Sequence, residues 1–263
     1  MTADIVDRVR SSPRYRAVDP ALVARLAEEE LPRARNADDA VKRVKRRLHQ
    51  AVGAFRPRAT SPRAVAWPAH DAVALRAACR DTMRAHASTR ERLPHIDRFF
   101  APIWERTGVP GRLLDLGCGL NPLALPWMEL GEVDYVAVDA DAAALRTVAG
   151  FLEAIGQPHR IEAHDLVRDH PTMDADVALL LKLVTTLDRQ DPDAAHRLLG
   201  ALRVRHAVVS FAARSLGGRG GRERTYRERL DRLISESGRV REVTEASVPN
   251  ELVFVLTLDR VDG

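Results

Sequence analysis

The chain has 263 residues, enough for one large or two modest domains, and 45% of its residues are hydrophobic. It contains no run of eighteen apolar residues, which argues against a membrane-spanning helix, and two cysteines are too few for a disulfide framework. The segment 1–16 is polar and does not resemble a secretory signal. We therefore expect a cytoplasmic protein with no membrane partner.

Positive charge is concentrated in the first third of the chain. Residues 1–95 contain 20 Lys and Arg against 11 Asp and Glu, whereas residues 96–263 contain 21 against 26. A basic region joined to a mildly acidic one favours a polyanionic partner for the first region. We expect two domains: a helical, basic, RNA-binding domain over residues 1–95 and a second domain over residues 96–263.

Helices are predicted throughout the first region. Asp19 and Pro20 form a typical helix start, and a second helix is expected from about Asp38 to Val52. Its apolar residues recur at three- and four-residue steps, and no Asp or Glu occurs from residue 40 to residue 70. A solvated helix face usually mixes charges of both signs, so this pattern favours contact with nucleic acid. The basic side chains concerned are Lys42, Arg43, Lys45, Arg46 and Arg47.

From residue 112 onward, short apolar runs alternate with helical patterns, which is typical of a parallel sheet covered by helices. The expected strands are 112–116, 134–138, 160–164, 176–181, 205–211, 240–246 and 251–258. The expected helices are 122–130, 141–156, 192–202 and 222–237. Too few residues separate the last two strands for a crossover helix, so these strands must pair antiparallel. The predicted fold class is α/β, with seven strands and an antiparallel last strand.

The segment 113–122 reads Leu-Leu-Asp-Leu-Gly-Cys-Gly-Leu-Asn-Pro and is the most informative part of the chain. It predicts a buried strand and then a turn, where Gly117 and Gly119 allow a ligand to approach closely. Asp115 precedes the turn, and Asp139 ends the next strand, where a carboxylate can accept both ribose hydroxyls of a nucleoside cofactor. The motif and the strand pattern resemble those of S-adenosylmethionine (SAM) methyltransferases, whose sheet is Rossmann-like. A dinucleotide site, which lacks its third glycine here, and a turn without a ligand are the other interpretations.

Further strand ends carry side chains suited to such a site. Asp165 follows the third strand, where its carboxylate can accept from an adenine amino group with Leu166 against the ring. Lys182 follows the fourth strand and is a compact charge beside the expected methyl donor. Phe211 ends the fifth strand, where it can stack a base, and Arg90 can reach the SAM carboxylate. The glycine-rich segment after Phe211 offers phosphate contacts from Arg214, Arg219 and Arg222.

Together these segments resemble one family, the aminoglycoside-resistance 16S rRNA guanine-N7 methyltransferases. The matching sequences are Leu-Asp-Leu-Gly-Cys-Gly-Leu-Asn-Pro-Leu-Ala-Leu (114–125), Leu-Leu-Leu-Lys (179–182), Val-Ser-Phe with Arg-Ser-Leu-Gly-Gly-Arg (209–219) and His-Ala-Ser-Thr-Arg-Glu-Arg-Leu (86–93). The resemblance covers most of the chain from about residue 70. The residues after Lys182 depart from the family pattern.

The resemblance implies methylation of N7 of guanine 1405 in 16S rRNA within the 30S subunit, and resistance to kanamycin- and gentamicin-type drugs. It implies SAM as the cofactor, with residues 96–263 as the methyltransferase domain. We expect no metal site and a monomer. The residues implied to hold SAM are Gly117, Gly119, Asp139, Asp165 and Leu166, and the sequence itself adds Asp115 and Arg90 as expected SAM contacts. Lys182 and Phe211 are implied at the reacting centre, and Ser215 joins the arginines of its segment as an RNA contact.

Three alternatives remain open at this point. The first is methylation of another decoding-site base, such as N1 of adenine 1408. The second is a SAM methyltransferase that acts on a small molecule, which would leave the basic first region without a use. The third is a non-catalytic RNA-binding protein that does not bind SAM.

Overall fold

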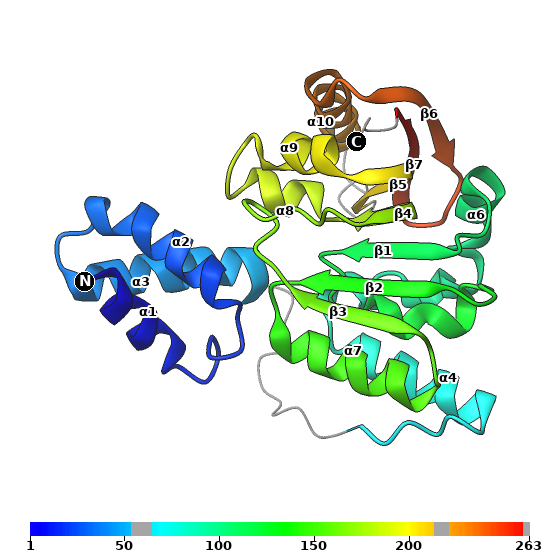
Figure 1. Ribbon diagram of the computed structural model, residues 1–263, viewed down its shortest axis with the longest axis horizontal. Helices are drawn as coiled ribbons and strands as arrows, with labels where there is room; N and C mark the ends of the chain where they lie inside the picture. Colours follow the sequence, from blue (N-terminus) through cyan, green and yellow to red (C-terminus); the bar gives the residue numbers. More distant parts are fainter. Residues whose placement is uncertain (54–64, 213–220, 260–263) are drawn as a thin grey trace.

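The computed structural model describes residues 1–53, 65–212 and 221–259, without the side chains of residues 221 and 222. Within these ranges the chain forms a seven-stranded sheet with helices on both faces and a separate bundle of helices at the amino terminus (Figure 1). The bundle lies at the edge of the sheet where the parallel strands end (Figure 1). No described helix is long and apolar enough to span a membrane.

The sheet has the strand order β3-β2-β1-β4-β5-β7-β6. Its strands are β1 (Arg112–Leu116), β2 (Asp134–Asp139), β3 (His159–Ala163), β4 (Asp174–Leu181), β5 (Arg203–Ala212), β6 (Val240–Ala246) and β7 (Glu251–Leu258). Strands β1 to β5 pair in parallel, and β7 pairs antiparallel with both β5 and β6. The α/β fold class and the antiparallel last strand predicted from the sequence are therefore confirmed.

The two faces of the sheet carry separate hydrophobic cores, because successive strand residues point to opposite sides. Leu113 of β1 belongs to one core, and its neighbour Leu114 belongs to the other. The first core is covered by α4 (Ala72–Arg84), η3 (Leu93–Arg98), α6 (Ala101–Thr107), η4 (Asn121–Trp127) and α7 (Ala142–Ala154), with α5 (Ala87–Arg90) between α4 and η3. The second core is covered by α8 (Val184–Asp188), α9 (Ala194–Ala201) and α10 (Gly221–Ser237).

The amino-terminal bundle, residues 1–53, has a third core of its own. Its elements are α1 (Thr2–Arg10), α2 (Pro20–Glu30), η1 (Leu31–Arg33), α3 (Ala37–Leu48) and η2 (His49–Gly53). The carboxylate of Asp19 accepts hydrogen bonds from the backbone N–H groups of Ala21 and Leu22, so the predicted start of α2 is confirmed. Ile5 and Val9 of α1, a helix to which the sequence analysis assigned no bounds, are one turn apart and buried in this core.

The predicted domain boundary near residue 95 is wrong. Leu75, Cys79 and Met83 form one stripe of α4, and all three belong to the first core of the sheet rather than to the bundle. The cores therefore divide the chain after residue 53, and residues 72–95 pack with the sheet. The sequence boundary fell too late because helical patterns lie on both sides of the true division, so no change of periodicity marks it.

Candidate active site

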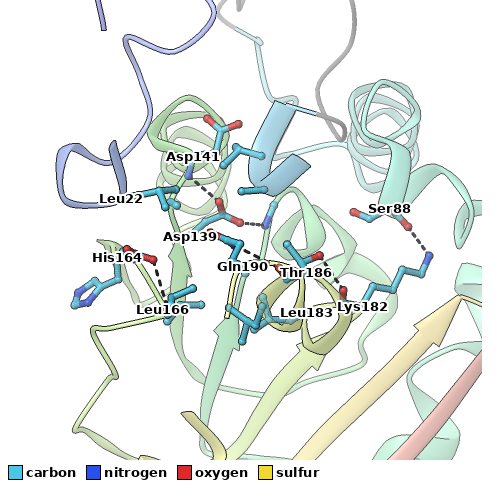
Figure 2. Close-up of a pocket in the computed structure, with 18 of the residues that line it drawn as sticks. Leu22, Ser88, Asp139, Asp141, His164, Leu166, Lys182, Leu183, Thr186 and Gln190 are labelled. Carbon is cyan, nitrogen blue, oxygen red and sulfur yellow. Dashed lines mark hydrogen bonds between the residues drawn. The ribbon is translucent and has the colours of Figure 1, made fainter. Parts of the chain in front are cut away.

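A pocket lies at the carboxyl edge of the sheet, between the sheet and the bundle (Figure 2). Its walls come from the glycine turn after β1, the end of β2, the segment after β3 and helix α8. The bundle closes it with Leu22, Ala51 and Val52. His86 and Ser88, from the segment before η3, complete the lining. The pocket is where open α/β sheets bind ligands.

The glycine turn requires glycine at both positions. Gly117 and Gly119 have φ values of +61° and +51°, in the left-handed region that other residues rarely adopt. A Cβ atom at Gly117 would lie 2.7 Å from a methyl carbon of Leu183, and one at Gly119 would lie 2.9 Å from the His86 ring. The structure therefore leaves no room for a side chain on this wall of the pocket.

Asp139 lies on the pocket at the end of β2, as the sequence analysis expected (Figure 2). One carboxylate oxygen accepts a hydrogen bond from the Gly119 N–H at 2.8 Å, and the other accepts from the Asp141 N–H at 2.7 Å. Asp139 thus ties the glycine turn to its own strand at the edge of the pocket.

Asp115 is not placed for the expected contact with a cofactor. Its side chain is 1% exposed and is not part of the pocket lining. One carboxylate oxygen accepts from the Asn121 amide at 2.9 Å and from the Tyr135 hydroxyl at 2.7 Å. Burial raises the pKa of Asp115 to about 6. This carboxylate anchors the glycine turn from inside the core, and the expected contact with SAM is therefore wrong.

Asp165 and Leu166 both line the pocket, but an unexpected arginine already binds Asp165. Nε of Arg25, from helix α2 of the bundle, donates to Asp165 at 2.5 Å, and Nη2 donates to the other carboxylate oxygen at 3.2 Å. Nothing in the sequence relates these two residues, which are 140 positions apart.

Lys182 reaches the pocket edge, but its ammonium group points away from Asp139 (Figure 2). Nζ donates to the Ser88 carbonyl at 3.1 Å and to Glu91 at 2.8 Å, and it lies 3.2 Å from Glu251. Two carboxylates therefore neutralise this charge. These contacts hold the 86–91 segment on the sheet, and the expected role of Lys182 at the reacting centre stays a prediction.

Glu251 and Arg92 extend this contact into a buried ion cluster that the sequence analysis missed. Arg92 pairs with both Glu251 oxygens, at 3.1 and 3.0 Å, and donates to the Asn121 side chain at 2.6 Å. The Ser210 hydroxyl donates to Glu251 at 2.8 Å. Burial alone would raise the pKa of Glu251, but Arg92, Lys182 and Ser210 together lower it. The available signal was an acid at the start of an otherwise apolar strand.

Phe211 and Arg90 are also placed differently from the expectation. Phe211 is 1% exposed, and its ring stacks on Tyr226 with 5.0 Å between ring centroids. It belongs to the second core, so it cannot stack a target base from this position. Arg90 is exposed and does not line the pocket, whereas His86 and Ser88 of the same segment do.

Comparison with known proteins identifies the family. The model of the family described as ribosomal RNA methyltransferase (FmrO) matches residues 10–255. The chain belongs to this family. It is 39% identical to the 16S rRNA (guanine(1405)-N(7))-methyltransferase of Frankia casuarinae, over 95% of this chain and 93% of that protein. It is 38% identical to the enzyme of the same name from Micromonospora echinospora, over 96% of this chain and 97% of that protein.

Solved structures agree with this membership. The 16S rRNA methyltransferase RmtF, determined in complex with S-adenosyl-L-homocysteine, superposes with a TM-score of 0.81 at 34% identity. The match covers 98% of both chains, so it includes the bundle as well as the sheet. The family predicted from the sequence motifs is therefore confirmed.

A ribosomal RNA methyltransferase must also bind RNA. The five basic residues of α3 differ in how far their side chains are exposed and free of ion pairs. Lys42 and Arg46 are exposed, and Lys45 is half-buried. Arg43 pairs with Asp39 at 3.1 Å and lies 3.7 Å from Glu30, whereas Arg47 pairs with Glu30 at 2.8 Å and Glu29 at 3.1 Å.

Arg43 and Arg47 are therefore less available for the expected RNA contact than Lys42 and Arg46. The acids that pair with them are Asp39, in the first turn of α3, and Glu29 and Glu30 of α2. All three lie before residue 40, outside the acid-free stretch that the sequence analysis considered. Of the expected RNA contacts after β5, Arg214, Ser215, Arg219 and the side chain of Arg222 lie outside the described residues.

Proposed function

We propose that this protein transfers a methyl group from SAM to N7 of guanine 1405 in the 16S rRNA of the small ribosomal subunit. The observation that carries this proposal is the combination of a nucleoside-type pocket with full-length similarity to enzymes named for that reaction. The proposal includes the assembled 30S subunit as the substrate, a cytoplasmic monomer as the enzyme, and resistance to kanamycin- and gentamicin-type aminoglycosides as the consequence.

The residues that line the pocket fit SAM. A carboxylate at the end of β2, here that of Asp139, suits the two ribose hydroxyls, and the bare backbone at Gly117 and Gly119 lets the ligand approach the turn. Leu166 and Leu183 supply apolar contacts for an adenine ring. When bound, SAM supplies an electrophilic methyl group on a sulfonium centre. The chain's own residues bind and orient that group at the strand ends.

The chemistry at guanine N7 requires no general base. N7 carries a free lone pair, so no proton leaves the attacking atom. Lys182, which lines the pocket, is held in ion pairs with Glu91 at 2.8 Å and Glu251 at 3.2 Å, in agreement with a reaction that does not need it as a base. Catalysis then depends on in-line placement of N7 and on exclusion of water. Because N7 faces the narrow major groove of A-form RNA, the target base must be unstacked first.

The exposed face of α3 supports contact with rRNA. Lys42 and Arg46 are the exposed cations there, and Lys45 is partly accessible. α3 continues into η2, whose Ala51 and Val52 line the pocket, so RNA held on this face lies near the reacting centre. Phosphate contacts of this kind position a nucleic acid without reading its sequence.

The decisive experiment is primer extension on 16S rRNA from cells with and without the protein, after borohydride reduction and aniline cleavage. We expect a stop at guanine 1405 with the wild-type protein and no stop with Asp139→Ala. A stop at adenine 1408 without chemical treatment would instead favour the neighbouring-base alternative. Absence of both stops, with methyl transfer to a soluble metabolite, would overturn the proposal.

A further inference from the structure

The bundle and the sheet domain are joined at the loop that follows Asp139. Val18 forms an antiparallel bridge with Asp141. The Asp19 N–H donates to the Ala140 carbonyl at 2.8 Å, and the Ala142 N–H donates to the Ala17 carbonyl at 2.9 Å. The backbone entering α2 is therefore fixed directly beside the expected ribose-binding carboxylate.

Arg25 makes a second junction, at the other end of the pocket. Its side chain is 2% exposed, and that of Asp165 is 5% exposed. Besides its two bonds to Asp165, the Arg25 guanidinium donates to the Gln190 side chain at 2.8 Å and to Glu29 at 3.0 Å. Asp165 and Gln190 both line the pocket, so one bundle residue fixes two pocket residues at once.

The contacts around Arg25 make this junction a wall of the pocket rather than an isolated ion pair. Arg47 donates to the Gln190 carbonyl at 3.3 Å, which ties α3 to the same loop. Leu22 lies one turn before Arg25 on α2 and contributes its side chain to the pocket lining (Figure 2).

We propose that the amino-terminal bundle forms the adenine side of the cofactor site, with Arg25 as the positioning residue for Asp165 and Gln190. Arg25 holds the Asp165 carboxylate in one orientation, so that it accepts from the adenine amino group. The inference rests on the proposed function for the identity of the cofactor. It adds that cofactor affinity depends on the docked bundle, and by linkage that RNA bound to the bundle and cofactor bound to the pocket influence each other's affinity.

The ion pair has a clear chemical consequence for recognition of the base. A carboxylate only accepts hydrogen bonds, so it prefers an amino group over a carbonyl oxygen when it is held toward the base. Without the two-pronged contact from Arg25, the Asp165 carboxylate can turn away from the base, and the Gln190 side chain loses its donor. Loss of Arg25 should therefore reduce discrimination at the base as well as affinity.

The test is calorimetric binding of two ligands to the full-length protein: S-adenosylhomocysteine, and its 6-oxo analogue S-inosylhomocysteine. For the wild-type protein we expect at least a tenfold preference for the adenine ligand. Arg25→Met should weaken S-adenosylhomocysteine binding about tenfold and bring the preference close to one. Asp165→Asn should behave similarly, and the double variant should lose little more than either single one, because both remove one interaction.

Arg33→Met is the matched control. Arg33 is a neighbouring bundle arginine whose side chain is 68% exposed, so its loss should change neither ligand's affinity. Arg25→Lys, which keeps the charge but not the two-pronged geometry, serves if Arg25→Met does not fold, and it should give an intermediate preference.

A folded Arg25 variant with wild-type affinity and wild-type preference would overturn the inference and leave the proposed function intact. Absence of S-adenosylhomocysteine binding to the wild-type protein would overturn the proposed function itself. An equal loss of affinity for both ligands, with the preference retained, would reduce Arg25 to a structural role and would also overturn the inference.

Discussion

Both walls of the pocket are held by buried ion pairs, one within the sheet domain and the other between the bundle and the sheet domain. The inner wall is the segment 86–92, which the ion cluster around Glu251 ties to the strand ends of its own domain. The outer wall is the bundle, which Arg25 ties to Asp165 across two separate cores. Both walls depend on buried ion pairs. Removing one partner of such a pair is strongly destabilising, because it leaves the other charge buried without a partner.

The difference between the walls lies in what each ion pair holds together. The inner cluster lies within one domain, so breaking it should lower the free energy of unfolding of that domain. The outer pair joins two cores, so breaking it should change the pocket while each core stays folded. Different residues therefore maintain the stability of the fold and the shape of the pocket, although the Glu251 cluster and the Arg25–Asp165 pair make similar contacts.

Arg92→Met should have the largest effect, because it breaks the inner wall. It leaves the buried Glu251 carboxylate without its bidentate partner and the Asn121 side chain without its donor. We expect the free energy of unfolding to fall by about 3–5 kcal/mol, measured by urea denaturation. Arg98→Met, at an exposed neighbouring arginine, is the control. A loss below about 1 kcal/mol would show that the cluster does not stabilise the core.

Asp115→Asn tests a buried carboxylate whose side-chain donors, Asn121 and Tyr135, are both neutral, whereas Glu251 also has the charged partners Arg92 and Lys182. Its pKa of about 6 lies above the ordinary value near 3.9 of an unfolded chain. The stability that this group contributes is thus complete below about pH 4 and is lost as the pH rises through about 6. Relative to Asp115→Asn, the wild-type protein should lose on the order of 3 kcal/mol between these limits.

The measurement for this prediction is urea denaturation of both proteins across that pH range. The amide oxygen of the substituted side chain can still accept from Tyr135 and Asn121, so the variant should fold. Parallel stability curves for the two proteins would contradict the raised pKa.

Gly119→Ala affects the turn that lies between the two walls. The left-handed backbone at Gly119 costs a residue with a Cβ about 1–2 kcal/mol, and the His86 ring must also shift. We expect a loss of stability of that size together with weaker S-adenosylhomocysteine binding, measured by calorimetry. Gly131→Ala is the matched control, since a Cβ there meets nothing within 4 Å. Unchanged ligand affinity in Gly119→Ala would remove the turn from the cofactor site.

The paired change Lys42→Ala and Arg46→Ala should have the smallest effect on stability and tests the outer surface of the bundle. Both side chains are exposed, so the free energy of unfolding should stay within about 0.5 kcal/mol of wild type. Affinity for purified 30S subunits should fall, with a shallower dependence on salt, in a filter-binding assay. Arg203→Ala, at the opposite end of the sheet, should change neither quantity. Unchanged affinity in the paired variant would assign RNA contact to another surface.

The strands and the glycine turn could be predicted because their signals are local. Apolar runs marked the strands, and the short connection between β6 and β7 required the antiparallel hairpin. Phe211 could not be placed in the same way, because an aromatic residue at a strand end looks the same whether it stacks a base or packs against Tyr226. Arg25 lies among ordinary helix formers, and only the fold brings it to Asp165. Contacts between segments far apart in the sequence produce no local periodicity, so they could not be predicted from the sequence.

The bridge between Val18 and Asp141 bears on how this enzyme can be inhibited. A ligand that fills the pocket itself would compete with the cofactor. A compound that inserts between Leu22 and the loop after β2 would instead separate the bundle from the sheet domain at the Val18–Asp141 bridge. Such a compound would not have to compete with the nucleoside, because it would prevent the bundle from closing the pocket.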